Sequence, residues 1–192
     1  MNSHFISFPR KRCVPVLWFR VLALVCLWFV SGELLHAQQD ERAVRAAYVF
    51  SLTKYVSWPN RQDRLVIGVV GDGDIGPVLK QVLDGKTSDG KNIKVAIHPS
   101  ENELRDCNML YVTDPSPGEV RSVLHRIGGR PILTVGETDG FIREGGGMVA
   151  LVRSGDQMQI EVNLKSLRMR QLQMSSRLLR LAVIVSGYEA VP

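Results

Sequence analysis

The sequence predicts a single α/β domain, and three observations point to it. Short continuous apolar runs alternate with segments of helical period between residues 65 and 135. Two further strand-like runs follow residue 145, separated by a four-residue turn. Segments of helical period also stand at both ends of this region. Continuous apolar runs are typical of parallel strands buried on both faces. We therefore expect a mostly parallel, Rossmann-like sheet finished by an antiparallel hairpin, with helices on both faces.

The parallel part is expected to contain four strands and three helices. Each strand is a run of four to six residues rich in valine, isoleucine and leucine, and each helix carries apolar residues three or four positions apart. The expected strands are residues 65–70, 93–97, 109–112 and 132–135, and the expected helices are a segment containing residues 78–83, then 101–105 and 117–127.

The predicted hairpin consists of residues 148–152 and 157–163, joined by Arg153-Ser154-Gly155-Asp156, a typical turn sequence. Side chains alternate between the two faces of a strand. The second strand therefore has an apolar face and a polar face that is either solvated or lines a groove. The apolar face carries Met158, Ile160 and Val162, and the polar face carries Gln157, Gln159, Glu161 and Asn163.

A helix is expected from Val44 until Pro59 stops it, because proline lacks the amide proton and disfavours helical angles in the preceding residue. At 100° per residue, one side of this helix forms an apolar stripe. Phe50 points to the back of the stripe and needs a cover of its own. The stripe consists of Val44, Ala47, Tyr48, Ser51, Leu52, Tyr55 and Trp58.

The last expected helix, Leu172 to Ser186, is apolar over most of its circumference. Such a helix is buried on more than one side. Either it packs beside the first helix and covers Phe50, or it forms a contact with a second chain. The side chains expected at this helix pair or dimer contact are Phe50, Leu178, Leu181 and Val185.

Residues 1–37 have the pattern of a secretory signal peptide, which leaves residues 38–192 as the mature domain. Arg10, Lys11 and Arg12 precede an apolar run from Val21 to Val30, and Ala37 offers a cleavage site. We expect cleavage and a periplasmic protein; retention as an N-terminal membrane anchor is the alternative. Removal leaves 24 − 4 = 20 basic and 19 − 1 = 18 acidic side chains. This near balance gives no reason to expect a nucleic-acid partner.

Cys107 is the one cysteine beyond the signal sequence, so the mature chain cannot form an internal disulfide. It precedes the apolar run that begins at Met109. A buried small side chain at the start of a strand is the favoured interpretation, and a reactive or intermolecular thiol is the alternative.

Gly71-Asp72-Gly73-Asp74-Ile75-Gly76 matches G-x-G-x-x-G between a strand and a helix. Two carboxylates would lie where a pyrophosphate binds, and Ile97-His98-Pro99 offers no acid for a ribose hydroxyl. We therefore expect no cofactor. The glycines are interpreted as a tight turn, with Asp74 capping the helix.

The residues capable of catalysis are few. His98 and His125 are the histidines of the mature chain, and neither belongs to a metal-ligand pattern. Glu137, Asp139 and Glu161 could form a carboxylate pair in space, but nothing in their spacing requires one. Glu144-Gly145-Gly146-Gly147 precedes a strand, which favours a tight turn over a phosphate loop. The sequence indicates no catalytic or metal site, and a protein that is not an enzyme.

Segments spread over the whole mature chain together resemble the YfiR family (DUF4154-type) of small periplasmic proteins. The motifs occur in the same order as in the family. The segments run through residues 46–48, 54–59, 85–86, 130–135, 141, 144–148, 161–164 and 175–182. Residues 50–53, Phe-Ser-Leu-Thr, depart from the Tyr-Asn-Phe-Ala run expected there, and the single cysteine cannot reproduce the disulfides of other members.

The resemblance implies a regulatory protein, usually a homodimer, that restrains an inner-membrane diguanylate cyclase of the YfiN type. Such a protein lowers cyclic-di-GMP and biofilm output, and an outer-membrane partner of the YfiB type can sequester it. We expect the partner-binding surface to include Phe141, Glu144, Gln159, Glu161 and Asn163. The alternative is a periplasmic small-molecule-binding sensor acting on a different membrane partner.

Overall fold

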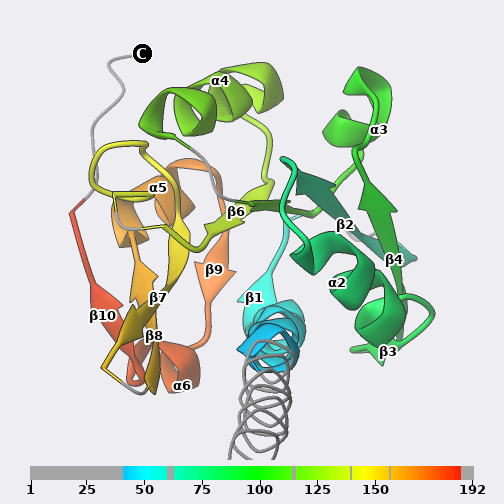
Figure 1. The fold of residues 1–192 in the computed structure, drawn as a ribbon, viewed down its shortest axis with the longest axis horizontal. Coiled ribbons are helices and arrows are strands. Elements are labelled where there is room, and N and C mark those ends of the chain that lie inside the picture. The colour runs from blue at the N-terminus through cyan, green and yellow to red at the C-terminus, as the bar shows by residue number, and fades with distance from the viewer. Residues whose placement is uncertain (1–40, 60–62, 114–115, 139, 156, 187–192) are drawn as a thin grey trace, which may run out of the picture. The chain divides into compact units, whose positions relative to one another are not determined.

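A computed structural model describes residues 41–59, 63–113, 116–138, 140–155 and 157–186. The predicted signal peptide, residues 1–37, lies outside these ranges. The chain divides into two units between Glu41 and Arg42. The main sheet of the second unit has eight strands in the order β10-β8-β7-β6-β5-β2-β4-β3 among the described residues. The predicted fold class is confirmed (Figure 1).

The centre of the sheet is parallel and one side of it is mixed. β2 pairs in parallel with β4 and β5, and β5, β6 and β7 continue the parallel part. β7 and β8 form the predicted antiparallel hairpin, and β10 pairs in parallel with β8. The strands are β2 Arg64–Val70, β3 Thr87–Ser88, β4 Lys91–Ile97, β5 Met109–Val112, β6 Leu133–Gly136, β7 Val149–Ser154, β8 Gln157–Val162 and β10 Ala182–Ile184.

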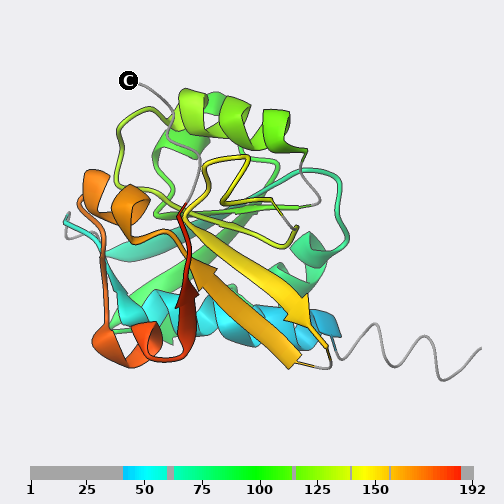
Figure 2. The same ribbon diagram turned by 90° about the vertical axis from the view of Figure 1, so that its left-hand side faces the viewer.

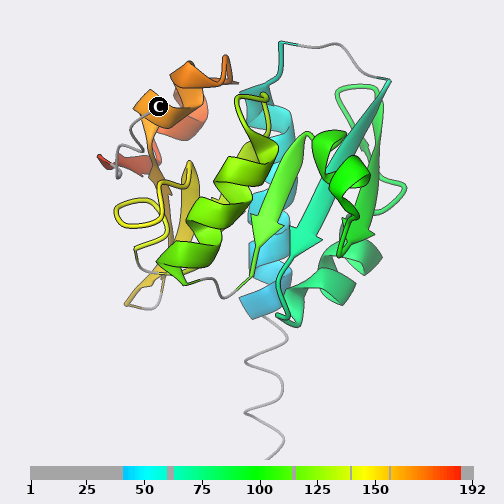
Figure 3. The ribbon, with the colours of Figure 1, turned by 90° about the horizontal axis from the view of Figure 1, so that it is seen from above.

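Helices cover both faces of the sheet, as predicted (Figures 1 and 3). The helix of residues 42–55 and α2 pack on one face, and α3 and α4 on the other. Alternate residues of one strand serve the two cores: Ile67 lies in the first and Val66 in the second. The other helices are α2 Ile75–Leu83, α3 Glu101–Arg105, α4 Pro117–Ile127, α5 Leu164–Met169 and α6 Ser176–Leu179.

Local sequence explains the helix starts on the second face. Ser100 and Ser116 each accept a hydrogen bond from the backbone N–H three residues later, and the glutamates at those positions, Glu103 and Glu119, bind back to the serine N–H groups. These are capping boxes. The same backbone hydrogen bonds lower the pKa of both carboxyl groups. Both helices have the bounds that the sequence predicted.

The first helix differs from its prediction. It ends at Tyr55, and the next two residues form strand β1, Val56–Ser57, paired with β9, Gln173–Met174. The buried stripe is centred on Ala46, Val49 and Leu52 rather than on Val44, which is exposed. The predicted stripe was therefore displaced by a fraction of a turn.

A buried polar residue explains this displacement. Thr53 belongs to the buried side of the helix, where its hydroxyl hydrogen bonds to Phe50 O at 2.6 Å and to Ser88 Oγ at 2.9 Å. Hydropathy alone places a threonine outside an apolar stripe. Phe50 is half-buried against the core, with the ammonium groups of Lys54 and Lys86 at 4.4 and 5.6 Å from its ring centroid.

The predicted last helix, residues 172–186, is wrong. This segment forms β9, the one-turn helix α6 and the edge strand β10. Gln171 has a positive φ of 58°, which turns the chain out of α5, and Ser175 N–H donates to Tyr55 O at 2.8 Å. Leu178 and Val185 are buried against the sheet rather than in a helix pair, and Leu181 is 77% exposed.

Cys107 is a free, buried cysteine two residues before β5, so the interpretation as a buried small side chain is confirmed. Burial raises the pKa of its thiol to about 12, with smaller contributions from Asp106 and Glu103. At neutral pH the thiol is therefore protonated and a poor nucleophile.

The strand assignment of residues 182–185 predicts an alternating pattern of amide hydrogen exchange. Val185 N–H donates to Val162 O at 3.0 Å. Because successive residues of a strand point their N–H groups to opposite sides, Val183 N–H also faces β8, and those of Ala182 and Ile184 face away. In the monomeric protein we expect slow exchange at Val183 and Val185 and fast exchange at Ala182 and Ile184. Uniform protection of all four amides in the monomer, measured by NMR, would instead indicate a helix.

Candidate functional site

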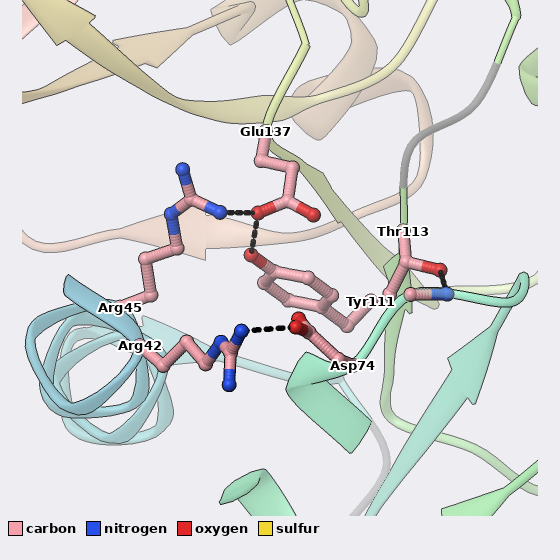
Figure 4. Close-up of polar contacts among 7 residues, drawn as sticks. Arg42, Arg45, Asp74, Tyr111, Thr113 and Glu137 are labelled. Carbon is pink, nitrogen blue, oxygen red and sulfur yellow. Dashed lines mark hydrogen bonds and ion pairs between the residues drawn. The ribbon is translucent and has the colours of Figure 1, made fainter. Parts of the chain in front are cut away.

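Two groups of side chains are candidates for function, and the first lies at the carboxyl ends of the parallel strands. The chain continues from β2 to β4 on one side and returns to β5 on the other. The carboxyl ends of β2 and β5 therefore form the topological switch point, where open α/β sheets commonly bind ligands. We name the residues here, Arg42, Arg45, Asp74, Tyr111 and Glu137, the carboxyl-edge cluster (Figure 4).

Arg45, Glu137 and Tyr111 form the more buried part of this cluster. The Arg45 guanidinium pairs with the Glu137 carboxylate, which also accepts a hydrogen bond from Tyr111 Oη at 3.2 Å. Burial, and then the negative charge of Glu137, raises the pKa of Tyr111. The phenol therefore keeps its proton and remains the donor. These contacts attach the first helix to the end of β6.

Arg42 and Asp74 form a second, more exposed ion pair between the first helix and the start of α2. Asp74 is the N-cap residue of α2, but its side chain makes no cap hydrogen bond. The prediction that Asp74 caps the helix is therefore wrong. The carboxylate pairs with the arginine instead.

The glycine turn after β2 is filled by Thr113, which supports its interpretation as structural. Gly73 N–H donates to Thr113 Oγ1 at 2.9 Å. A Cβ atom at Gly71 or Gly73 would approach Thr113 to 2.5 or 2.6 Å, so both positions need glycine for this contact. The amide of Gly73 is thus already bonded, and the close approach of the turn is to a side chain of the protein.

The second group lies on the connection from β6 to β7 and on the hairpin. Phe141 is 1% exposed, so the prediction that it forms part of the surface is wrong. Cβ atoms at Gly136 and Gly147 would each lie 2.2 Å from its ring, and one at Gly145 would approach Phe141 O to 2.8 Å. The glycines leave room for the ring to lie beneath the loop. Phe141 therefore fixes residues 140–147 of the loop from inside.

The surface of this loop is joined to its neighbours by polar contacts. Arg143 pairs with Glu161 of β8 at 3.3 Å, and Arg121 of α4 donates to Glu144 O at 2.8 Å. The side chain of Glu144 is exposed and Gln159 is half-buried. Val183 of β10 lies beside Glu161 in register. We name Arg143, Glu144, Gln159, Glu161 and Val183 the loop-hairpin face. Figure 2 shows the ribbon of the hairpin and of β10, which carry three of these residues.

Asn163 does not belong to this face, although its position in the sequence predicted so. Its side chain is buried and accepts a hydrogen bond from Ser166 N–H at 3.1 Å, capping α5. The strand ends at Val162, so alternation no longer decides where residue 163 points. Of the five predicted binding residues, the structure thus brings Glu144, Gln159 and Glu161 together near the surface.

Sequence reasoning did not identify Arg45 or Arg143 as parts of these sites. Arg45 and Glu137 are 92 positions apart, and no local spacing relates them. Arg143 stands beside Glu144 in a loop, a position in which a charged residue is unremarkable.

Comparison with known protein families matches the chain to the model described as YfiR/HmsC-like (DUF4154) over residues 42–183. The chain belongs to the YfiR/HmsC-like family. The matched region begins in the first helix and ends within β10, so it includes the carboxyl-edge cluster and the loop-hairpin face. A comparison with curated proteins finds no match.

Membership in the YfiR/HmsC-like family implies repressor-type regulation of a diguanylate cyclase. Proteins of this family are regulatory rather than catalytic, and they are periplasmic. Within the described ranges, no set of three or more His, Cys, Asp or Glu side chains could hold a metal ion. In the same ranges, no helix has the length and apolar character needed to cross a membrane.

We predict that the two ion pairs of the carboxyl-edge cluster of this YfiR/HmsC-like protein differ in their contribution to stability. The side chains of Arg45 and Glu137 are 22% and 13% exposed, against 31% and 67% for Arg42 and Asp74. Arg45→Met leaves a largely buried carboxylate unpaired and should lower the free energy of unfolding by about 2 kcal/mol. Arg42→Met should lower it by at most about 0.5 kcal/mol. Urea denaturation measures the free energy of unfolding of both variants, and equal losses would contradict the predicted difference between the two ion pairs.

The packing of Phe141 predicts a steric effect at Gly147. Gly147→Ala places a methyl group in contact with the ring and should destabilise the fold by about 3 kcal/mol. Gly118→Ala, in the first turn of α4, places a methyl group 3.9 Å from Ser116 Oγ, an ordinary van der Waals distance, and should leave stability unchanged or raise it by up to about 1 kcal/mol. Thermal unfolding of the two variants tests the packing. A Gly147→Ala variant as stable as the Gly118→Ala variant would rule it out.

Proposed function

We propose that the protein binds the periplasmic part of an inner-membrane diguanylate cyclase and holds it in an inactive arrangement, lowering cyclic-di-GMP and biofilm output. Family membership supports the type of regulation. The loop-hairpin face supports the mode of binding, because it presents an exposed carboxylate and an ion pair on a rigid sheet. A protein that binds one of two states of its partner shifts the population toward that state.

The observation that carries this proposal is the anchoring of the β6–β7 loop. Glu137 attaches its start to the first helix, Phe141 fixes it from below, and Arg121 and Glu161 bind it from α4 and β8. A loop held at four points loses little conformational entropy on binding, which favours affinity. Arg143 and Glu144 are thereby presented to a partner in one arrangement.

We propose that the protein reaches the periplasm after removal of residues 1–37, leaving residues 38–192. The signal-like sequence and the family's periplasmic location support this. Sequestration by an outer-membrane partner of the YfiB type is proposed from the family resemblance alone.

We also propose a homodimer, with the edge strand β10 as its contact. Leu181, just before β10, is 77% exposed, and Val183 and Ile184 within it are 39% and 50% exposed. No charged residue lies between positions 181 and 185. Soluble proteins protect such edges, because unpaired strand backbone associates with other strands. The outward backbone groups of Ala182 and Ile184 suit an antiparallel pair centred on Val183, in which Ala182 faces Ile184 of the second copy.

The proposed mode of cyclase binding predicts different outcomes for a charge swap and a single reversal. Glu144→Arg should abolish repression and raise cyclic-di-GMP without unfolding the domain, because the Glu144 side chain is exposed. The double variant Arg143→Glu/Glu161→Arg keeps an ion pair but inverts its polarity. It should stay folded and still fail to repress, because binding requires each charge of the face to meet an opposite charge on the partner.

Lys80→Glu is the matched control, since it reverses an exposed charge on α2, on the other face of the sheet. It should repress normally. Cellular cyclic-di-GMP and crosslinking to the cyclase are measured in strains that produce each variant at equal levels. Full repression by both Glu144→Arg and the swapped pair would refute binding through the loop-hairpin face.

The proposed dimer predicts that Val183→Lys yields a monomer, because the two lysines would face each other at the symmetry axis. Met169→Lys is the control, since Met169 is an exposed apolar residue on α5, outside β10. Sedimentation at several protein concentrations should show dimers for the wild type and for Met169→Lys. A wild type that stays monomeric, or a Val183→Lys variant that still dimerises, would disprove this contact.

A further inference from the structure

A cavity of about 140 Å³ lies at the edge of the sheet opposite the carboxyl-edge cluster. Its walls come from Trp58 after β1, Arg105 at the end of α3, Asn108 before β5, and Arg130 and Ile132 before β6. β5 and β6 are parallel neighbours, so the residues before them meet at one edge. We name this cavity the amino-edge pocket. Neither the family match nor the proposed docking surface assigns it a role.

Hydrogen bonds fix the walls of the amino-edge pocket before any ligand is present. Trp58 Nε1–H donates to Asn108 O at 2.8 Å, and the same oxygen accepts from Leu133 N–H at 2.9 Å. Asn108 Oδ1 accepts from Val66 N–H at 2.8 Å. The indole and the asparagine are therefore held in place. A pocket that is already formed loses less free energy on binding than one that must be ordered.

Two arginines, Arg105 and Arg130, are the charged residues that line the pocket. Their guanidinium groups make no ion pair or hydrogen bond with any described residue. A third arginine, Arg170, donates to Gly128 O and to Arg130 O, which holds the loop before β6 in place and adds positive charge.

Negative charge near the pocket is limited. Cys107, which also lines it, is a neutral thiol at physiological pH because burial raises its pKa to about 12. Asp106 and Glu103 are close enough to contribute to that shift. Both side chains are exposed to solvent, as are Arg105 and Arg130, so salt screens the charges of either sign. The pocket thus combines two available guanidinium groups with the apolar surfaces of Trp58, Pro131 and Ile132.

We propose that the amino-edge pocket binds a small organic anion, with its carboxylate or phosphate group between Arg105 and Arg130 and its apolar part against Trp58 and Ile132. Guanidinium groups bind both kinds of anion through paired N–H donors. The cavity volume restricts the apolar part to a few carbon atoms. The pocket shares no residue with the loop-hairpin face, so anion binding can be measured without the cyclase.

The fluorescence of Trp58 provides a measurement of ligand binding to the pocket. The chain has three tryptophans, Trp18, Trp28 and Trp58, so a full-length Trp18→Phe/Trp28→Phe protein reports fluorescence from the pocket alone. The probes are isobutyrate, inorganic phosphate and the neutral isobutyramide. We expect a saturable change with isobutyrate, phosphate or both, on the order of millimolar for such small ligands. Isobutyramide should bind at least about tenfold more weakly. Which anion saturates distinguishes a carboxylate from a phosphate ligand.

Arg105→Gln and Arg130→Gln should each weaken anion binding about tenfold or more. Arg180→Gln should not, since Arg180 is an exposed arginine at the C-cap of α6 and does not line the pocket. Thermal unfolding checks that the variants are folded. The proposal is overturned if no anion gives a saturable change, if isobutyramide binds as well as isobutyrate, or if both pocket variants bind like the wild type. These results do not depend on cyclase repression, so failure of one proposal is distinguishable from failure of the other.

Discussion

The structure depends on one requirement: the parallel strands at its centre must be covered on both faces. The helix of residues 42–55 supplies much of the cover on one face through Ala46, Val49 and Leu52, which are fully buried. The same helix carries Arg42 and Arg45 to the carboxyl edge of the sheet, and the strand that follows it carries Trp58 to the opposite edge. A single covering element therefore contributes to both ends of the sheet.

The parallel core was predictable because each element there has a complete local signal. β2 and β5 are continuous apolar runs, and α3 and α4 start at serines followed three residues later by glutamate. The C-terminal segment lacks such signals. Residues 178–185 are apolar at every position except Arg180, and such a run suits a helix or a strand equally well. Strands form here because the turn at Gln171 ends α5 and the segment can pair with the free edges of β1 and β8.

The candidate sites were predictable only in part, for a related reason. Glu144, Gln159 and Glu161 were recognised because charged or polar residues on a loop and a strand face lie near solvent. Phe141 was predicted at the surface because a segment with three glycines near an aromatic residue is typical of an exposed loop. In the structure these glycines instead make room for the ring. Arg45 and Arg143 gain their roles from partners distant in the sequence, Glu137 and Glu161. Only the folded arrangement brings these pairs together.

The long sequence separation of the first helix's contacts has a consequence for how the chain folds. Arg45 reaches a partner 92 positions later, and Tyr48 donates to Met158 O, 110 positions later. Contacts between residues so far apart form slowly, because the loop between them must close first. The first helix is synthesised early but reaches its final position only after most of the chain has been synthesised. A chain that cannot complete its core early stays extended for longer, which would suit the export proposed above.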